Sequence, residues 1–148
     1  MNYTLERQVD DYVENELKEK LGLSSQDYGM ESNMDEYLKQ ALKGGAKTDN
    51  HTNFGIPDYN VTKYSIPVLI ENKLHSKYLV KLNSKDEISS TKTDIKNYAV
   101  NGALHYGRTI IASHKYDACV IVGIAGDSDD HWMFCGFGPT GAFRFPSR

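Results

Sequence analysis

An unbroken apolar run near the end of the chain, residues 118–124, constrains the fold more than any other feature. A strand with one wet face alternates polar and apolar residues, whereas a continuous run of this length is typical of a strand buried on both faces. We therefore expect residues 118–124 to form a central, parallel strand in a sheet that carries helices on both sides. With 148 residues, the chain is long enough for one domain with a substantial core.

Three other segments have apolar residues at three- and four-residue spacing, which predicts three helices. The first covers about residues 5–20 and the second about residues 33–43. The third covers about residues 94–113, with Thr93 or Asp94 as its N-cap. Small residues in the middle of its inner face favour close packing against a sheet.

Three more segments complete the predicted sheet. Residues 54–61 and 66–73 have the composition of strands and are joined by a short polar connection, so we expect an antiparallel hairpin. Residues 132–137 form the last strand, and the polar stretch 83–93 is a flexible loop. The resulting order, α-α-β-β-α-β-β, predicts an α/β fold with a mixed central β-sheet flanked by helices, in which residues 118–124 run parallel to the hairpin strand before them.

The charge of the chain is unevenly placed. The net charge is −3, but residues 1–40 carry −6 and the rest carries +3. This distribution argues against a uniformly basic nucleic-acid-binding protein and permits a local basic face beside a cluster of acids. Lysines gather around the predicted hairpin and loop, where they form either a rim that contacts phosphate or an ordinary solvated surface. They are Lys47, Lys63, Lys77, Lys81, Lys85, Lys92 and Lys96, with Arg108 and Lys115 nearby.

The sequence also indicates the compartment. No apolar run reaches the roughly 18 residues of a membrane span, and the first residues do not have the pattern of a signal peptide. The two cysteines, Cys119 and Cys135, fit neither a disulfide framework nor a zinc site. We expect both to be buried free thiols in a cytoplasmic protein with no membrane partner.

A pair of carboxylates ends the two strands of the predicted hairpin, Asp58 on the first and Glu71 on the second. Antiparallel pairing brings them close together, and two carboxylates that meet in this way repel unless a cation lies between them. Mg²⁺ takes oxygen ligands of this kind, and the main-chain carbonyl of Asn72 is a further candidate ligand.

Lys73 follows Glu71 on the same face of its strand, and we expect the other face to be the one in the core. Beside a metal and an incoming phosphate, Lys73 can orient or deprotonate water and offset charge in the transition state. A site of this composition hydrolyses phosphodiesters by in-line displacement.

These residues resemble a known family. The pattern Asp58…Glu71-Asn72-Lys73 resembles the core motif of the PD-(D/E)XK nuclease superfamily. The wider surroundings, from about residue 5 to residue 126, resemble the N-terminal nuclease domain of type I restriction enzyme motor subunits and of fused restriction–methylation enzymes. Residues 55–59 match the family's Gly-x-x-Asp-Tyr motif, and residues 68–73 match its apolar-Glu-x-Lys strand. The resemblance implies a restriction-endonuclease-like core with the order α-β-β-α-β.

The resemblance also implies roles for individual residues. Asp58 and Glu71 would be metal ligands for Mg²⁺, with Mn²⁺ as a substitute, and Lys73 would be catalytic. Glu6, at the start of the first helix, would be an auxiliary acid that reaches the metal or its waters. Two alternatives stay open: Glu14 is the relevant acid instead, or Glu6 serves only the helix dipole.

The predicted third helix and its approach carry the candidates for DNA contact. The family has a Gln-Ala-x-x-Tyr-type motif in this helix; the glutamine is absent here, and Asn101 is the polar residue that we expect to replace it. His105 and Arg108 continue a polar stripe at helical spacing, and Lys92 precedes them. This stripe either borders the cleft and meets phosphate or is a solvated face.

By resemblance, the chain is a Mg²⁺-dependent DNA endonuclease domain of a restriction–modification system. Its partners would be DNA and further domains or subunits of the same complex. Two other interpretations stay open. One is a catalytically inactive DNA-binding or scaffold module of this fold, and the other is a repair, phage or junction-resolving nuclease, which needs the same three residues. Residues 138–148 look like an unfinished element, so we expect residues 1–148 to be one nuclease-like domain at the N-terminus of a longer protein.

Overall fold

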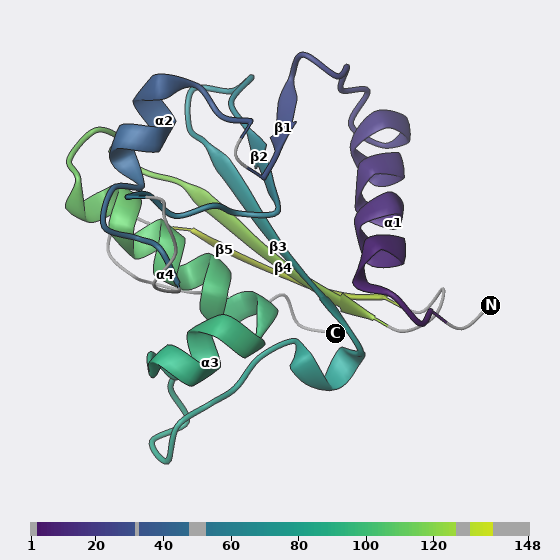
Figure 1. The fold of residues 1–148 in the computed structure, drawn as a ribbon, viewed down its shortest axis with the longest axis vertical. Coiled ribbons are helices and arrows are strands. Elements are labelled where there is room, and N and C mark those ends of the chain that lie inside the picture. Colours follow the sequence, from purple (N-terminus) through teal and green to yellow (C-terminus); the bar gives the residue numbers. More distant parts are fainter. Residues whose placement is uncertain (1–2, 32, 48–52, 127–130, 138–148) are drawn as a thin grey trace.

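The computed structural model describes residues 3–31, 33–47, 53–126 and, by their backbone alone, 131–137. It confirms the α/β class, because a five-stranded mixed sheet carries helices on both faces (Figure 1). In chain order the elements are α1 (Glu6–Glu19), β1 (Tyr28–Met30), α2 (Glu36–Ala41), β2 (Tyr59–Val61), β3 (Val68–Leu74), the 3₁₀ helix η1 (Ser76–Tyr78), α3 (Lys92–Asn97), α4 (Ala99–Ala112), β4 (Val120–Gly126) and β5 (His131–Phe137).

The strands of the sheet follow one another in the order β1-β2-β3-β4-β5, and among the described strands β3 and β4 are the parallel pair. The apolar run predicted as a buried strand is β4, and its residues from Ile121 to Gly126 are buried. The predicted hairpin is formed by β2 and β3, which pair antiparallel with Tyr59 opposite Ile70. The predictions of a central parallel strand and of the hairpin are therefore confirmed.

Two strands differ from the prediction. The sequence does not predict β1, because three residues at the edge of a sheet are too few to show a period of two. The strand predicted over residues 54–61 is much shorter, since β2 begins only at Tyr59. Gly55 instead lies against the ring of Tyr106, where a Cβ atom would come within 2.5 Å of a ring carbon. Phe54 forms an isolated bridge with Lys43.

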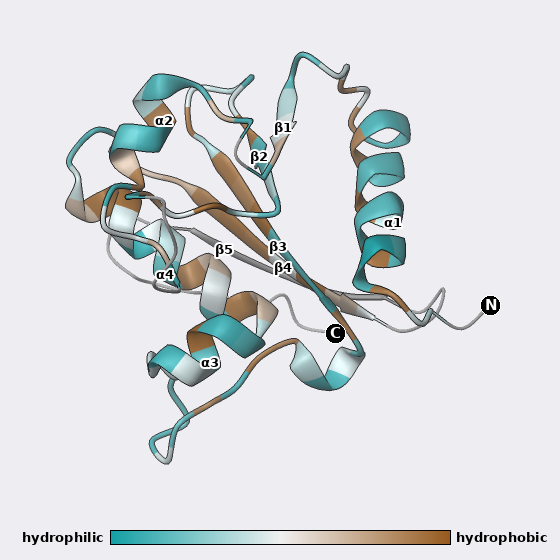
Figure 2. Ribbon diagram, in the orientation of Figure 1, coloured by the Kyte–Doolittle hydropathy of each residue, from teal (hydrophilic) through white to brown (hydrophobic). Residues whose placement is uncertain are grey.

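Each face of the sheet has its own hydrophobic core. Helix α1 covers one face, and helices α2 and α4 cover the other (Figure 1). Strand β3 takes part in both cores, because Leu69 on one face is 0% exposed and Ile70 on the other is 4% exposed. Figure 2 shows the apolar middle of β3 and β4 between these helices. The expectation that only one face of this strand lies in the core is therefore wrong.

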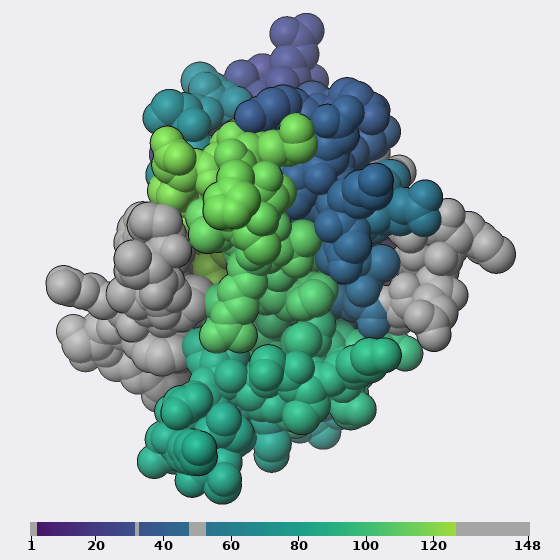
Figure 3. Space-filling view, turned by 90° about the vertical axis from the view of Figure 1, so that its left-hand side faces the viewer, coloured from purple at the N-terminus to yellow at the C-terminus, as the bar shows by residue number. Residues whose placement is uncertain are grey.

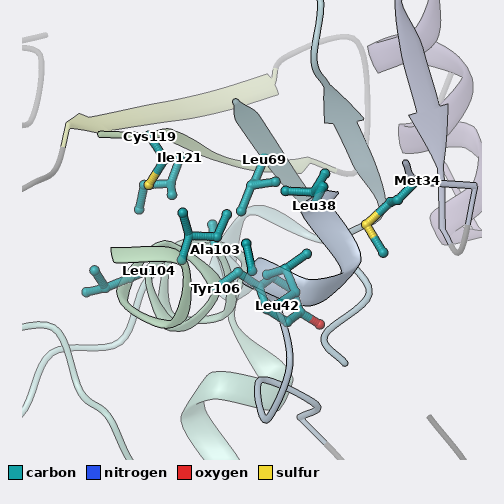
Figure 4. Close-up of a cluster of buried hydrophobic side chains, with 11 residues drawn as sticks. Met34, Leu38, Leu42, Leu69, Ala103, Leu104, Tyr106, Cys119 and Ile121 are labelled. Atoms are coloured by element: carbon teal, nitrogen blue, oxygen red, sulfur yellow. The ribbon is translucent and has the colours of Figure 1, made fainter. Parts of the chain in front are cut away.

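Figure 4 shows the core beneath α2 and α4, in which Leu69 packs in one cluster with Ala103 and Tyr106 of α4. Cys119 belongs to the same cluster and is 2% exposed, and burial raises the pKa of its thiol to about 11. Cys119 is thus a buried free thiol, as predicted. The side chain of Cys135 lies outside the described residues.

The helix predicted over residues 94–113 is interrupted. Helices α3 and α4 meet at Tyr98, which has an extended backbone with φ −120° and ψ 137°. The amide of Val100 lies in the first turn of α4 and so has no partner within that helix. It donates to the carbonyl oxygen of Leu79 at 2.8 Å, so a tertiary contact stabilises the break.

Helix α3 also begins earlier than predicted. Its first residue is Lys92, so the end of the predicted loop 83–93 is helical. The N-cap is Thr91, whose hydroxyl oxygen accepts from the amide of Asp94 at 3.2 Å. The prediction that Thr93 or Asp94 caps this helix is wrong. In the part of the chain that the structure describes, no helix has both the length and the apolar character that crossing a bilayer requires.

Candidate active site

The ends of β2 and β3 carry the acidic residues singled out from the sequence. Asp58 immediately precedes β2, and Glu71 and Lys73 lie on β3. Because Tyr59 pairs with Ile70 in an antiparallel ladder, the next step of the register sets Asp58 opposite Glu71. Asp58, Glu71 and Lys73 line one pocket of about 240 Å³. Its complete lining is Ala46, Lys47, Ile56, Asp58, Glu71, Lys73, Lys96 and Tyr106.

Main-chain amides hold the two carboxylates side by side. The amide of Asp58 donates to Oε1 of Glu71 at 3.1 Å, and the amide of Asn72 donates to Oδ2 of Asp58 at 2.7 Å. Each acid is therefore fixed by the strand that carries the other. Glu71 is only 1% exposed, so water contributes little to its solvation.

The proximity of the two acids changes the protonation of Asp58. Burial, followed by the charge of Glu71, raises the pKa of Asp58 to about 8. The hydrogen bond from the Asn72 amide and the charge of Lys47 oppose this increase. A divalent cation between the carboxylates would counteract both causes, because it replaces lost solvation and separates like charges. The pair therefore suits a hard cation such as Mg²⁺.

The donor set for such a cation is small. Among the described residues, no group of three or more histidine, cysteine, aspartate or glutamate side chains is arranged to hold a metal ion. Two carboxylates, a main-chain carbonyl and water would have to suffice, and this is a usual way for proteins to bind Mg²⁺.

The side chain of Asn72 does not face the carboxylate pair. It points to the α1 side of β3, where its Nδ2 donates to Oδ1 of Asp10 at 2.8 Å. Its Oδ1 is buried and has no hydrogen-bond partner. The predicted metal ligand at this position can therefore be only the main-chain carbonyl.

Glu6 lies beside Lys73. It is in the first turn of α1, and its Oε1 is 4.0 Å from Nζ of Lys73. Both side chains line a second pocket of about 380 Å³, so Lys73 borders both cavities. Burial raises the pKa of Glu6, and the charge of Lys73 opposes that effect. Glu14, the alternative auxiliary acid, instead accepts a hydrogen bond from the hydroxyl of Tyr28 at 2.8 Å and pairs with Lys18, and it lines neither pocket.

Asn101 is buried, so the prediction that it contacts DNA is wrong. It is 1% exposed. Its Nδ2 donates to the carbonyl oxygens of Lys81 at 2.9 Å and Ser89 at 2.8 Å, and its Oδ1 accepts from the amide of Lys81 at 2.9 Å. The side chain is thus fully used in fixing the segment before α3 to α4.

The other three predicted DNA-binding residues do not line the pocket around Asp58 and Glu71 or the neighbouring one. His105 is partly buried, and its Nε2 is 2.9 Å from the carbonyl oxygen of Gly45. Arg108 and Lys92 are exposed. The structure therefore does not bring these residues together with the carboxylates.

Three residues with polar side chains line the pocket but have no individual role in the sequence prediction: Lys47, Lys96 and Tyr106. Lys47 comes from the segment after α2, and its ammonium forms an ion pair with Oε2 of Glu71. That segment continues from α2, and Figure 3 shows the blue part of the chain that contains α2 lying beside the green helix α4. The only sequence signal for Lys47 and Lys96 is their membership of the lysine-rich group, which does not distinguish them from solvated lysines.

The fold and the site define an α/β domain in which two carboxylates and three lysines line one pocket at the end of the β2–β3 pair. Comparison with curated proteins finds a similarity to part of a restriction–modification enzyme. The chain is 33% identical over 110 residues to the type II restriction enzyme and methyltransferase RM.BcgI of Heyndrickxia coagulans. The match covers 74% of this chain and 17% of that protein, so the chain spans a small part of its relative. No family model matches the chain, and no solved structure matches it significantly.

Proposed function

We propose that the chain is a Mg²⁺-dependent DNA endonuclease domain of a restriction–modification system. The observation that carries the proposal is the reciprocal fixing of Asp58 and Glu71, with Lys73 in the same pocket. Burial and the mutual repulsion of the two carboxylates disfavour their charged forms, and a divalent cation bound between them would offset both effects. The name of the relative from Heyndrickxia coagulans supports the restriction–modification context.

In this proposal Asp58 and Glu71, with the carbonyl of Asn72, hold Mg²⁺, and Mn²⁺ takes its place. The bound ion supplies Lewis acidity and a lowered pKa for a coordinated water. Lys73 orients the attacking water and offsets the negative charge that develops on the phosphoryl oxygens. The attacking water releases a proton to solvent as its oxygen bonds to phosphorus, the bond to the leaving oxygen breaks in line, and the leaving oxygen takes up a proton from solvent. Glu6 pairs with Lys73 and so helps to hold its ammonium at the border between the two pockets.

Cleavage of supercoiled plasmid tests the proposal. The protein, together with any further domains or subunits of its system, is incubated with plasmid in Mg²⁺, in Mn²⁺ and in EDTA. We expect metal-dependent nicked or linear products, and a loss of at least about 100-fold in rate for Asp58→Asn and for Lys73→Met. Asp11→Asn and Lys18→Met are matched controls on the exposed side of α1 and should cut like the wild type. Metal-dependent cutting that Asp58→Asn leaves intact would contradict the assignment.

One observation favours a second candidate, a non-catalytic DNA-binding or scaffold module. Lys47 already pairs with Glu71 and so neutralises one carboxylate without a metal. For such a module, Asp58→Asn would leave restriction in cells unchanged, and no metal would bind in the pocket. The plasmid assay and a Mn²⁺ titration therefore separate the two candidates.

A further inference from the structure

The side chain of Lys47 lies largely buried in the wall of the pocket. Its side chain is 14% exposed, although lysine is rarely buried unless it is paired. Its ammonium contacts Oε2 of Glu71 and lies 5.1 Å from the centre of the Tyr106 ring. The carboxylate and the aromatic face both favour a cation at this point.

The neighbouring helix leaves room for this ammonium. Gly102 of α4 faces it, and a Cβ atom there would be 3.0 Å from Nζ of Lys47 and 3.4 Å from Oε2 of Glu71. Any side chain at position 102 would therefore press on the ion pair. The segment that carries Lys47 is also anchored, because the carbonyl oxygen of Gly45 lies 2.9 Å from Nε2 of His105 on α4.

We infer that Lys47 is a second catalytic lysine, which neutralises Glu71 before the metal binds and contacts the scissile phosphate afterwards. The inference rests on the proposed nuclease function. Glu71 has two oxygens: Oε1 accepts from the amide of Asp58, and Oε2 is paired with Lys47. A divalent ion that binds Glu71 competes with the ammonium for this carboxylate. The displaced ammonium stays in the same pocket, where a DNA phosphate is the next anion available to it.

Competition between the Lys47 ammonium and the metal predicts the direction in which metal affinity changes when Lys47 is replaced. The ammonium and the metal each lower the affinity of Glu71 for the other, because both are cations that use one carboxylate. Removing the ammonium should therefore tighten metal binding, while a residue that only supports the fold would loosen metal binding when removed. At the same time, cleavage should become slower, because one positive charge on the phosphate is lost.

The first test is a calorimetric titration with Mn²⁺ of wild-type protein, Lys47→Met and Lys96→Met at one pH. We expect Lys47→Met to bind Mn²⁺ about tenfold more tightly, a coupling within the usual range for two linked ligands. Lys96→Met removes a lysine of the same pocket that makes no ion pair with Glu71 among the described contacts, and its Mn²⁺ affinity should change far less. Unchanged or weaker Mn²⁺ binding by Lys47→Met would overturn the inference.

A second measurement uses the wild-type chain and so does not depend on how the variant folds. Amine-selective labelling followed by peptide mass spectrometry reports how readily each lysine reacts. We expect Lys47 to react slowly without metal, because its ammonium is paired, and several-fold faster with Mg²⁺ but without DNA. Equal labelling in both states would show that the metal does not displace Lys47.

The outcomes separate this inference from the proposed function. The nuclease proposal itself fails if wild-type protein does not bind Mn²⁺, or if Asp58→Asn binds Mn²⁺ as tightly as the wild type does. If wild-type protein binds Mn²⁺ and cuts DNA, but Lys47→Met cuts at the wild-type rate, only the role of Lys47 fails. With both predictions met, Lys47→Met combines tighter Mn²⁺ binding with a cleavage rate lowered at least about tenfold.

Discussion

The surroundings of Asp58 are unlike those of an ordinary surface acid. Burial and the charge of Glu71 raise its pKa, and the hydrogen bond from the amide of Asn72 opposes this increase. In metal-free protein at neutral pH, Asp58 therefore retains a proton that it would lose in the unfolded chain. The stability of the fold and the charge of the site are thus linked through this residue.

The linkage predicts how stability depends on pH. The pKa of Asp58 is about 8 in the folded chain, against an ordinary value of 3.8. Between these values the folded state binds one proton more than the unfolded state, so Asp58 makes the free energy of unfolding fall as pH rises towards 8, by at most about 1.4 kcal/mol per pH unit. Urea unfolding in EDTA at pH 6, 7 and 8 should show this decrease in the wild type. Equal slopes for wild type and Asp58→Asn would contradict the shift.

Metal binding should show the complementary dependence. If the proposed function holds, Mg²⁺ binds the unprotonated carboxylate of Asp58 and so must displace its proton at low pH. We expect Mg²⁺ to raise the melting temperature more at pH 8.5 than at pH 6.5, and Asp58→Asn to remove most of this gain. A calorimetric titration in buffers of different ionisation enthalpy should detect up to one proton released per Mg²⁺ near pH 7. Proton uptake instead of release would exclude Asp58 as the linked group.

At the scale of elements, several predictions from sequence succeed because a regular pattern carries them. Helix α1 and strand β4 have strong periodic or continuous apolar patterns, and the structure contains both. The break at Tyr98 cannot be predicted in this way, because it is stabilised by the hydrogen bond between Val100 and Leu79, a contact between distant parts of the chain.

The same distinction applies to the candidate site. Asp58, Glu71 and Lys73 lie on or next to strands whose pairing follows from the sequence, and so their meeting can be predicted. Lys47 comes from an irregular segment after α2, and only the packing of that segment on α4 directs it to Glu71. Asn101 is predicted as the substitute for the family's glutamine, but its side chain faces the chain itself because the segment before α3 covers it.

Asn101→Ala tests whether the hydrogen bonds of Asn101 to the segment before α3 stabilise the fold. The change leaves the amide and carbonyl of Lys81 and the carbonyl of Ser89 without their partner, and we expect a loss of about 2–3 kcal/mol in the free energy of unfolding. Asn97→Ala, at an exposed position on α3, is the matched control and should change stability by less than about 0.5 kcal/mol. A normal free energy of unfolding for Asn101→Ala, combined with weaker DNA binding, would restore the original interpretation.

Close contact between α4 and the sheet gives another prediction at this scale. A Cβ atom on Gly123 of β4 would lie 2.7 Å from the amide nitrogen of Val100 and 2.9 Å from its Cα. Neither backbone atom can yield easily, so Gly123→Ala should lower the free energy of unfolding by about 1–3 kcal/mol. Thermal or urea unfolding measures the change. A fully stable Gly123→Ala protein would mean that α4 lies farther from β4.

At the scale of the whole molecule, the two cores share one strand. Strand β3 is packed by α1 on one side and by α2 and α4 on the other, and the same strand carries Glu71 and Lys73. Its residues cannot shift without disturbing both cores. Interiors packed on two sides transmit strain instead of absorbing it.

The shared strand has a consequence for how the pocket could admit the proposed substrate. Strand β3 carries Glu71 and Lys73 and is packed on both faces, while Lys47 and Lys96 belong to segments outside the sheet. We therefore expect these two segments to yield more readily than β3 when the pocket widens, so that the acids keep their positions. Substitutions in the segments that carry Lys47 and Lys96 should therefore alter access to the pocket without moving the carboxylates at β3.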